Sequence, residues 1–144
     1  LNFWFPIFDI DINSTFVIYP NYWKKKISNS SENFDYETWK KKFRFTANKH
    51  IKSDKRNHPL PLEKVDISEE FRVDCNAGDL VVFSGCHLHG SIPNTSNKTR
   101  FSIDFRIISK DFYEREIGVN IDSKSTGSTI YDFKNSLNLK KYSI

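Results

Sequence analysis

The chain has 144 residues, of which 38% are hydrophobic and 15% aromatic, including thirteen phenylalanines. This length supports one domain with a core of its own, and the composition excludes an intrinsically disordered chain. The net charge of +4 is too small to indicate a nucleic-acid partner, although it suits an acidic ligand.

The first twelve residues, LNFWFPIFDIDI, alternate as in a β-strand. Phe3, Phe5 and Ile7 fall on one face of that strand. Asn2 and Trp4 fall on the other face. We expect one face to be buried and the other to line a cavity.

A second strand is expected at residues 15–20, TFVIYP, and the chain then becomes basic over residues 22–62. Aromatic residues recur in this basic insertion at helical spacing, namely Tyr36, Trp39 and Phe43. Asp35 or Ser31 is suited to cap that helix. The insertion is too short to bury a core alone, so the prediction is a single domain over residues 1–144.

Residues 71–83, FRVDCNAGDLVVF, predict a strand, a tight turn and a second strand. Residues 99–108 alternate between an apolar face of Phe and Ile and a face that carries arginine, serine and aspartate. A short helix is expected at 111–116. This rhythm predicts a mainly β fold with an inserted helix, an antiparallel sandwich or barrel.

The most patterned stretch is GDLVVFSGCHLHGSIPNTSNKTRFSIDFR, residues 78–106. His87 and His89 stand two residues apart, so on a strand they share a face. Imidazole nitrogen binds divalent iron, zinc and copper, which makes the pair a candidate metal site. Taken alone, such a pair is more often structural or incidental.

The residues after the histidines strengthen the indication of a site. Ser91 offers a hydroxyl, and a turn through Pro93 and Asn94 leads back to Arg100. In a returning hairpin, Arg100 would stand near His89. A guanidinium binds a carboxylate through two hydrogen bonds, whereas a lone arginine is more often a solvated surface charge.

This stretch resembles the distal half of the iron(II)- and 2-oxoglutarate-dependent dioxygenases, in particular the phytanoyl-CoA dioxygenase-like family. The resemblance implies a double-stranded β-helix, the jelly-roll or cupin-like fold, with iron(II) and 2-oxoglutarate as cofactors. By the match, His89 is the last iron ligand of a two-His, one-carboxylate site. Ser91 and Arg100 match the positions that hold the far carboxylate of 2-oxoglutarate.

A second resemblance covers residues 1–22, which are similar to the strand after the family's first metal motif and to the next strand end. It implies that Asn2 and Trp4 face the cosubstrate pocket. The basic insertion and the C-terminal tail fall outside the resemblance.

The chain departs from the family pattern in one respect that decides its activity. None of its four histidines begins a His-x-Asp or His-x-Glu motif, so two of the three iron ligands are absent. The chain also begins at Leu1 within a strand pattern and contains no Met. We interpret it as the C-terminal portion of a dioxygenase, incomplete at its N-terminal side and inactive alone, with a degenerate relic as the other interpretation.

The predicted function is therefore hydroxylation of a small-molecule substrate by an iron(II)- and 2-oxoglutarate-dependent oxygenase. The lysines of the insertion suit an acidic substrate, and a solvated basic face is the other interpretation of them. A non-catalytic cupin-like domain that binds a metal or ligand is the alternative. A nucleic-acid-binding module that uses WKKK and WKKKFRF is a third and weaker one. An exposed sheet edge is expected to promote self-association.

Two features of the sequence bear on the cellular compartment of the protein. Cys75 and Cys86 form no CxxC motif and are expected to be reduced thiols, as in an intracellular protein. No apolar run reaches the roughly 20 residues that span a membrane. We therefore expect a cytoplasmic protein without a membrane partner.

Overall fold

The computed structural model describes residues 1–42, 59–115, 117 and 132–141. The chain divides into two compact units. Unit 1 is the β-rich part of the chain and consists of Leu1–Ile27 and Val65–Ile121. Unit 2 consists of the basic insertion, Ser28–Lys64, together with the C-terminal residues Asp122–Ile144. The single domain stays a prediction, because compactness alone does not decide whether unit 2 folds by itself.

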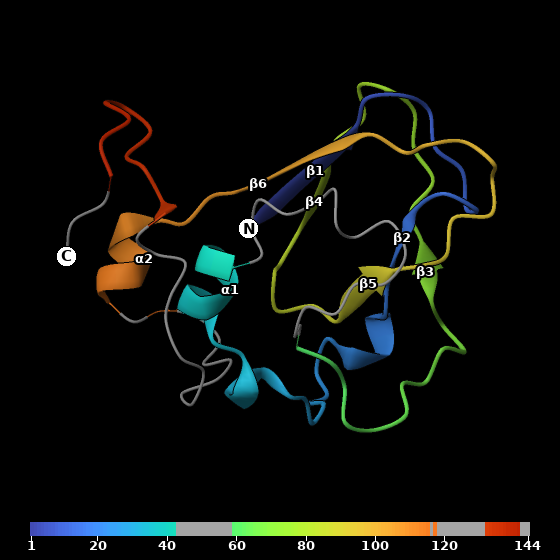
Figure 1. Ribbon diagram of the computed structural model, residues 1–144, viewed down its shortest axis with the longest axis horizontal. Helices are drawn as coiled ribbons and strands as arrows, with labels where there is room; N and C mark the ends of the chain where they lie inside the picture. The colour runs from blue at the N-terminus through green and yellow to red at the C-terminus, as the bar shows by residue number, and fades with distance from the viewer. Residues whose placement is uncertain (43–58, 116, 118–131, 142–144) are drawn as a thin grey trace. The chain divides into compact units, whose positions relative to one another are not determined.

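The first sheet of unit 1 has three antiparallel strands in the order β4-β1-β6 (Figure 1). These strands are β1 (Asn2–Pro6), β4 (Val81–Phe83) and β6 (Ser102–Arg106). The central strand β1 is rich in phenylalanine, which suits a strand with neighbours on both sides. Its partners lie far along the chain, since Asn2 pairs with Arg106.

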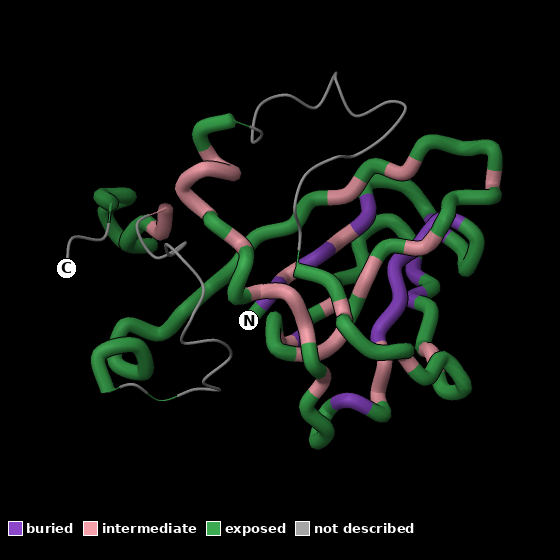
Figure 2. Tube along the Cα trace, turned by 60° about the horizontal axis from the view of Figure 1, so that its bottom comes forward, coloured by how far each residue is buried: buried purple, intermediate pink, exposed green. Residues whose placement is uncertain are grey.

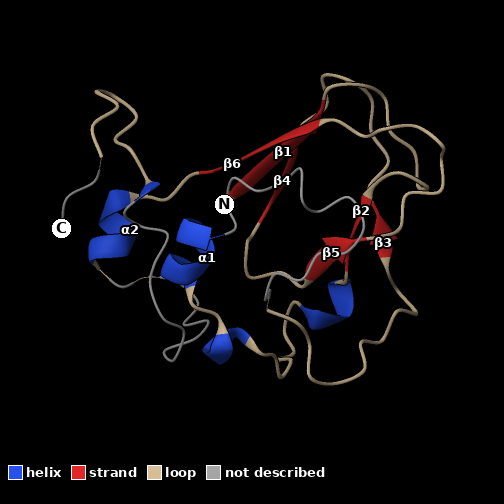
Figure 3. Cartoon of the chain, in the orientation of Figure 1, coloured by secondary structure: helices blue, strands red, loops and turns tan. Residues whose placement is uncertain are grey.

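The second sheet of unit 1 also has three antiparallel strands, in the order β3-β2-β5 (Figure 3). They are β2 (Phe16–Ile18), β3 (Phe71–Arg72) and β5 (His89–Ser91). All three residues of β2 are buried, as expected for a short apolar strand at the centre of a sheet. The prediction of a mainly antiparallel β fold is confirmed.

Strands that follow one another in the chain often belong to different sheets. This contradicts the pairing expected for the two strands of residues 71–83. The strands at either end of residues 71–83 do not form a hairpin, because β3 pairs with β2 and β4 pairs with β1. The predicted turn itself is present: the Asp79 amide donates to the Asn76 carbonyl at 3.0 Å, and Gly78 has a φ of +97°. The turn reverses the chain, but its two arms join different sheets.

The core of unit 1 draws on both sheets. Its members are largely aromatic or branched (Trp4, Ile10, Phe16, Ile18, Val73, Cys75 and Phe83), and the buried residues are purple in Figure 2. Since β1 and β4 belong to one sheet and β2 to the other, the sheets pack face to face through this cluster. Burial raises the pKa of the Cys75 thiol, whereas Cys86 is exposed.

The two faces of β1 differ in burial, and the polar-looking face is the buried one. Asn2 and Trp4 are 4% and 6% exposed, while Phe3 and Phe5 are only half-buried and Ile7 is exposed. The second sheet packs against the Asn2 and Trp4 face. The alternation of β1 is therefore as predicted, but the phenylalanine side does not face the core.

Short helices complete the described residues. In unit 1, a 3-10 turn (η1, Pro20–Tyr22) follows β2, and α2 (Lys110–Glu114) follows β6. The Ser109 hydroxyl accepts from the Phe112 amide at 3.4 Å at the start of α2. No helix in these described segments is long and apolar enough to cross a membrane.

Unit 2 contains η2 (Ser31–Asn33) and α1 (Tyr36–Lys42). α1 covers most of the helix predicted from its aromatic spacing, and Phe43 lies outside the described residues. The Lys40 ammonium lies 2.5 Å from a carboxylate oxygen of Asp132, and the Tyr36 hydroxyl donates to the same carboxylate. A charged residue near the C-terminus thus binds the helix of the insertion.

Asp35 directly precedes α1 and caps its first turn, as the sequence predicts. Its carboxylate accepts from the Thr38 hydroxyl at 2.6 Å and from the Thr38 amide at 3.0 Å. These hydrogen bonds hold the pKa of Asp35 below its usual value of 3.8. A carboxylate in this position satisfies an amide that the helix itself leaves unbonded.

Acidification is therefore expected to loosen the first turn of α1. Because the folded pKa of Asp35 is depressed, its contribution is present above pH 3.8 and is lost as the pH falls through the lower folded pKa. The chemical shift of the Thr38 amide, followed by NMR through an acid titration, measures the loss. Asp35→Asn keeps an accepting oxygen and should abolish this titration step; a step that persists in Asp35→Asn would contradict the assignment.

Candidate functional site

His89 is the first residue of β5 and pairs with Ile18 of β2. Its ring packs edge-on against the Phe83 ring, with centroids 5.0 Å apart. Its Nδ1 lies 2.7 Å from the His87 carbonyl oxygen. Because a carbonyl only accepts, Nδ1 carries the proton of this hydrogen bond. In the neutral form of the exposed ring, Nε2 is then the nitrogen with the lone pair that can bind a metal ion.

Ser91 is the last residue of β5 and lies opposite Phe16. It is exposed, and strand alternation places it on the same face of β5 as His89. The backbone of β5 therefore presents an imidazole and a hydroxyl side by side.

Arg100 lies two residues before β6 and is partly buried. Its Nη1 donates to the Ser14 carbonyl at 3.2 Å, and its guanidinium carbon lies 5.9 Å from the centre of the Trp4 ring. Burial lowers the pKa of Arg100, although a guanidinium keeps its charge at neutral pH. Among the residues that the structure describes, no carboxylate forms an ion pair with Arg100.

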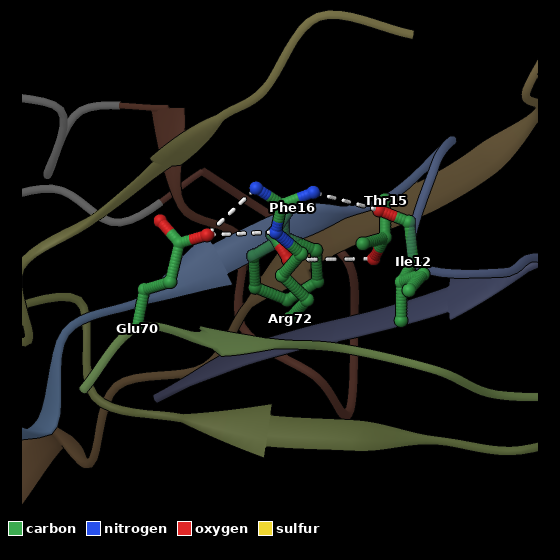
Figure 4. A network of polar contacts seen from close by, with 5 residues as sticks. All are labelled: Ile12, Thr15, Phe16, Glu70 and Arg72. Carbon is green, nitrogen blue, oxygen red and sulfur yellow. Dashed lines mark hydrogen bonds and ion pairs between the residues drawn. The ribbon is translucent and has the colours of Figure 1, made fainter. Parts of the chain in front are cut away.

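Arg72 provides a direct contrast within the same unit (Figure 4). Its Nε and Nη2 lie 2.8 and 2.7 Å from a carboxylate oxygen of Glu70, and its Nη1 donates to the Ile12 carbonyl at 3.4 Å. Both arginines thus contact the backbone just before β2. Arg72 has a carboxylate partner, whereas the more buried Arg100 keeps its charge available for an anion.

A row of aromatic rings connects the arginine to the histidine. Ring centroids lie 4.9 Å apart for Trp4 and Phe16 and 5.5 Å apart for Phe16 and Phe83. Arg100 lies over the Trp4 end of this row, and His89 packs on the Phe83 end. The row crosses from one sheet to the other, so the two polar residues border one apolar cluster.

The route that joins Arg100 to this cluster differs from the predicted one. β5 and β6 lie in different sheets, so they do not form the returning hairpin that the sequence suggested. The pairing of β6 with β1 in one sheet places Arg100 over Trp4 instead. Phe16 and Phe83 were not predicted as part of the site, and only their place in apolar strands hinted at it.

Asn2 occupies the buried face of β1 beside Trp4. Its side-chain oxygen accepts from Arg106 Nε at 3.1 Å. A Cβ at Gly85 would lie 3.5 Å from that oxygen, so the backbone at Gly85 approaches Asn2 closely. The role of Asn2 toward a cosubstrate stays a prediction, as does that of Trp4.

His87 lies beside the site but faces a different neighbour. Its ring stacks on that of Trp23, with centroids 5.2 Å apart and planes 22° apart. Trp23 is 59% exposed. The sequence carries no signal of this pair, because residues 23 and 87 are distant in the chain.

The described residues contain no group of three His, Cys, Asp or Glu side chains placed to hold a metal ion. His50 and His58 lie outside the described residues. In the described part of the chain, His89 therefore stands as a single candidate ligand, which does not fit a complete iron site.

The model of the phytanoyl-CoA dioxygenase family matches residues 3–102, about two thirds of the chain. The chain belongs to the phytanoyl-CoA dioxygenase family. This family comprises, in general, oxygenases that depend on iron(II) and 2-oxoglutarate. The match includes His89, Ser91 and Arg100, and so confirms the family resemblance on which their assignment rests. No curated protein and no solved structure matches the chain significantly.

Proposed function

We propose that this member of the phytanoyl-CoA dioxygenase family supplies the distal wall of an oxygenase site that hydroxylates a small molecule. The partly buried charge of Arg100, without a carboxylate partner among the described residues, is the observation that carries the proposal. When bound, iron(II) and 2-oxoglutarate would supply the oxidising power for hydroxylation. The chain's own residues bind and orient the cosubstrate.

In this proposal Arg100 binds the far carboxylate of 2-oxoglutarate. The hydrogen bond to Ser14 and the contact with Trp4 fix the direction of the guanidinium. Such a fixed guanidinium can donate two parallel hydrogen bonds to a carboxylate. The Ser91 hydroxyl would add a third, and the apolar Trp4 and Phe16 rings would exclude water from the pair.

His89 is the proposed metal ligand of this wall. The hydrogen bond to the His87 carbonyl sets its tautomer and orientation, as ligand histidines usually require. The described residues do not complete an iron site. The proposed role of the described residues is therefore to bind a carboxylate.

We also propose the double-stranded β-helix for unit 1. Two three-stranded antiparallel sheets that share one core support it, and so does the passage of the chain from β4 to β5 to β6 through alternate sheets. Closure of two sheets in this way is typical of jelly rolls.

The proposed substrate is a small acidic molecule, attracted by the lysines of the basic insertion. Three of these lysines end α1, and Lys40 among them is already paired with Asp132 (Lys40, Lys41 and Lys42). The lysines of a cytoplasmic enzyme would raise the local concentration of an anion through long-range attraction. Because salt screens such attraction, we expect the affinity for the substrate to fall steeply as salt is added.

Titration of the chain with 2-oxoglutarate tests the proposed function. The matched control ligand is pyruvate, which keeps the 2-oxo acid group and lacks the far carboxylate. We expect ligand-observed NMR to detect binding of 2-oxoglutarate and a much weaker response to pyruvate. Equal responses would contradict the proposal that Arg100 recognises the far carboxylate.

A non-catalytic cupin-like binding domain is the second candidate, favoured by the single histidine ligand in the described residues. We predict that the 144-residue chain binds no iron(II) in a tight one-to-one complex, because one imidazole is too few ligands for a three-point site. Anaerobic iron titration by calorimetry measures this, with His89→Ala as the control. Tight binding that His89→Ala abolishes would contradict it and would require further ligands, with Asp9 and Asp11 the first to test.

A further inference from the structure

The two histidines of the patterned stretch differ in what their rings contact. The His87 ring stacks on Trp23. The His89 ring packs on Phe83. The histidines meet through a hydrogen bond instead, because Nδ1 of His89 lies 2.7 Å from the His87 carbonyl oxygen. A neutral imidazole carries its proton on either of two nitrogens, and a bond of this kind selects one of them. The backbone of residue 87 therefore decides which nitrogen of His89 keeps its lone pair.

The peptide group that joins His87 to Leu88 carries this carbonyl, and its neighbours on both sides are held. The His87 amide donates to the Ser84 carbonyl at 3.0 Å, which closes a turn after β4. The Leu88 carbonyl accepts from the Tyr19 amide at 3.0 Å. In the described part of the chain, no backbone hydrogen bond reaches the peptide group between these two anchors. Its orientation therefore depends on the side chain of His87.

Trp23 has a fixed place at the end of η1. Its amide donates to the Pro20 carbonyl at 3.0 Å. The preceding residue, Tyr22, is buried, and its hydroxyl accepts from the Asp66 amide at 2.7 Å. These contacts anchor η1 to the residues before β3. The indole reaches from this anchor to the His87 ring, and a centroid distance of 5.2 Å with planes 22° apart is the geometry of an offset stack.

We propose that Trp23 is a positioning residue for His89, and that it acts through the ring and the carbonyl of His87. The stack restrains residue 87 and with it the direction of the carbonyl. The carbonyl holds the proton of the His89 ring at Nδ1 and leaves Nε2 as the nitrogen that can bind a metal ion. The use of this orientation rests on the proposed function, in which His89 is a metal ligand. The contacts themselves involve no metal and lie within unit 1.

His87 is thereby assigned a role other than metal binding. Two imidazoles that share a metal ion must turn toward one point, but these two rings pack on different segments of the chain. His87 stacks on the residue after η1, and His89 packs on the last residue of β4. A stack that only stabilised the loop would not alter the position of the proton on His89. The two roles therefore differ in one measurable property, the tautomer of His89.

The test reads this tautomer from the nitrogen chemical shifts of the His89 ring in the isotope-labelled chain, with His89→Ala to assign the signals. At about pH 8.5, where an ordinary imidazole is neutral, we expect a protonated Nδ1 and an unprotonated Nε2. Trp23→Ala should shift the two signals toward each other, because the proton then divides between both nitrogens. Trp23→Phe keeps a ring that stacks and should restore the wild-type signals.

A second variant reaches the same contact from its other side. His87→Ala keeps the carbonyl and removes the ring, and should shift the His89 signals as Trp23→Ala does. The double variant should add nothing further, because both changes remove one interaction. Circular dichroism establishes that each variant is folded.

Phe8→Ala is the matched control. Phe8 is 62% exposed, close to the 59% of Trp23, and its ring packs edge-on against that of Phe101 at 6.2 Å. The control thus removes an exposed ring from an aromatic pair that includes neither histidine. It should leave the His89 signals unchanged.

A wild-type His89 with its proton on Nε2 would overturn the proposal. So would wild-type signals in folded Trp23→Ala, or a shift in Phe8→Ala as large as that in Trp23→Ala. None of these results would affect the binding of 2-oxoglutarate by Arg100. Failure of the 2-oxoglutarate titration, in turn, would remove the proposed function and leave the tautomer result intact.

Discussion

Replacing Phe16 with alanine is expected to lower the free energy of unfolding by about 3–5 kcal/mol. Phe16 belongs to the sheet β3-β2-β5 and is 6% exposed. Its ring contacts Trp4 and Phe83, which both belong to the other sheet. Its loss would leave a cavity between the two sheets, where close packing prevents a full collapse. Because small domains unfold at a total cost of about 5–15 kcal/mol, the variant should be close to its limit of stability.

Equilibrium unfolding in urea measures the change, with Phe71→Ala as the matched control. Phe71 lies in β3 of the same sheet as Phe16 but is 56% exposed. The control should cost less than about 1 kcal/mol, because it removes little buried surface. Equal losses in the two variants would show that the sheets do not meet at Phe16.

Replacing Arg100 with alanine is expected to weaken binding of 2-oxoglutarate by about 10- to 100-fold. A hydrogen-bonded pair with a charged group contributes on the order of 1.5–3 kcal/mol, which corresponds to that range. The guanidinium is oriented by Ser14 and Trp4, so little order has to be imposed on binding. Ligand-observed NMR titration gives the dissociation constants.

Two further variants separate the binding of a carboxylate from general charge. Arg72→Ala removes an arginine that is already paired with Glu70 and should leave 2-oxoglutarate binding unchanged. Arg100→Lys keeps the charge but not the planar pair of donors, and should bind with intermediate affinity. An Arg100→Ala chain with wild-type affinity would assign Arg100 to the support of the Ser14 loop instead.

The strand alternation of β1 and β6 and the antiparallel class could be predicted from the sequence, because period-two patterns depend only on neighbours in the chain. The partner of each strand could not be predicted from the sequence. The Asn76–Asp79 turn was identified correctly, yet its arms joined different sheets. A turn signal reports local backbone geometry, whereas the choice between two sheets depends on pairing with strands more than 50 residues away in the chain.

The candidate site divides in the same way. His89, Ser91 and Arg100 were predicted as site residues because they match a family motif of fixed spacing, and their roles stay predictions. The contact of Arg100 with Trp4 depends on the pairing of β6 with β1, and the row through Phe16 depends on side chains from both sheets. The buried side of β1 could not be predicted for this reason: the strand alone does not reveal on which side the second sheet packs.

The position of β1 at the centre of its sheet also governs when this protein can fold. Its two neighbours begin about 80 and 100 residues later, at Val81 and Ser102. On a ribosome that adds about 5–20 residues per second, the phenylalanines of β1 emerge several seconds before either partner strand exists. During that interval the strand is an apolar segment in search of a partner, and contacts of such long range form slowly. Synthesis in the cell should therefore depend on chaperones that hold this segment until β6 has left the ribosome.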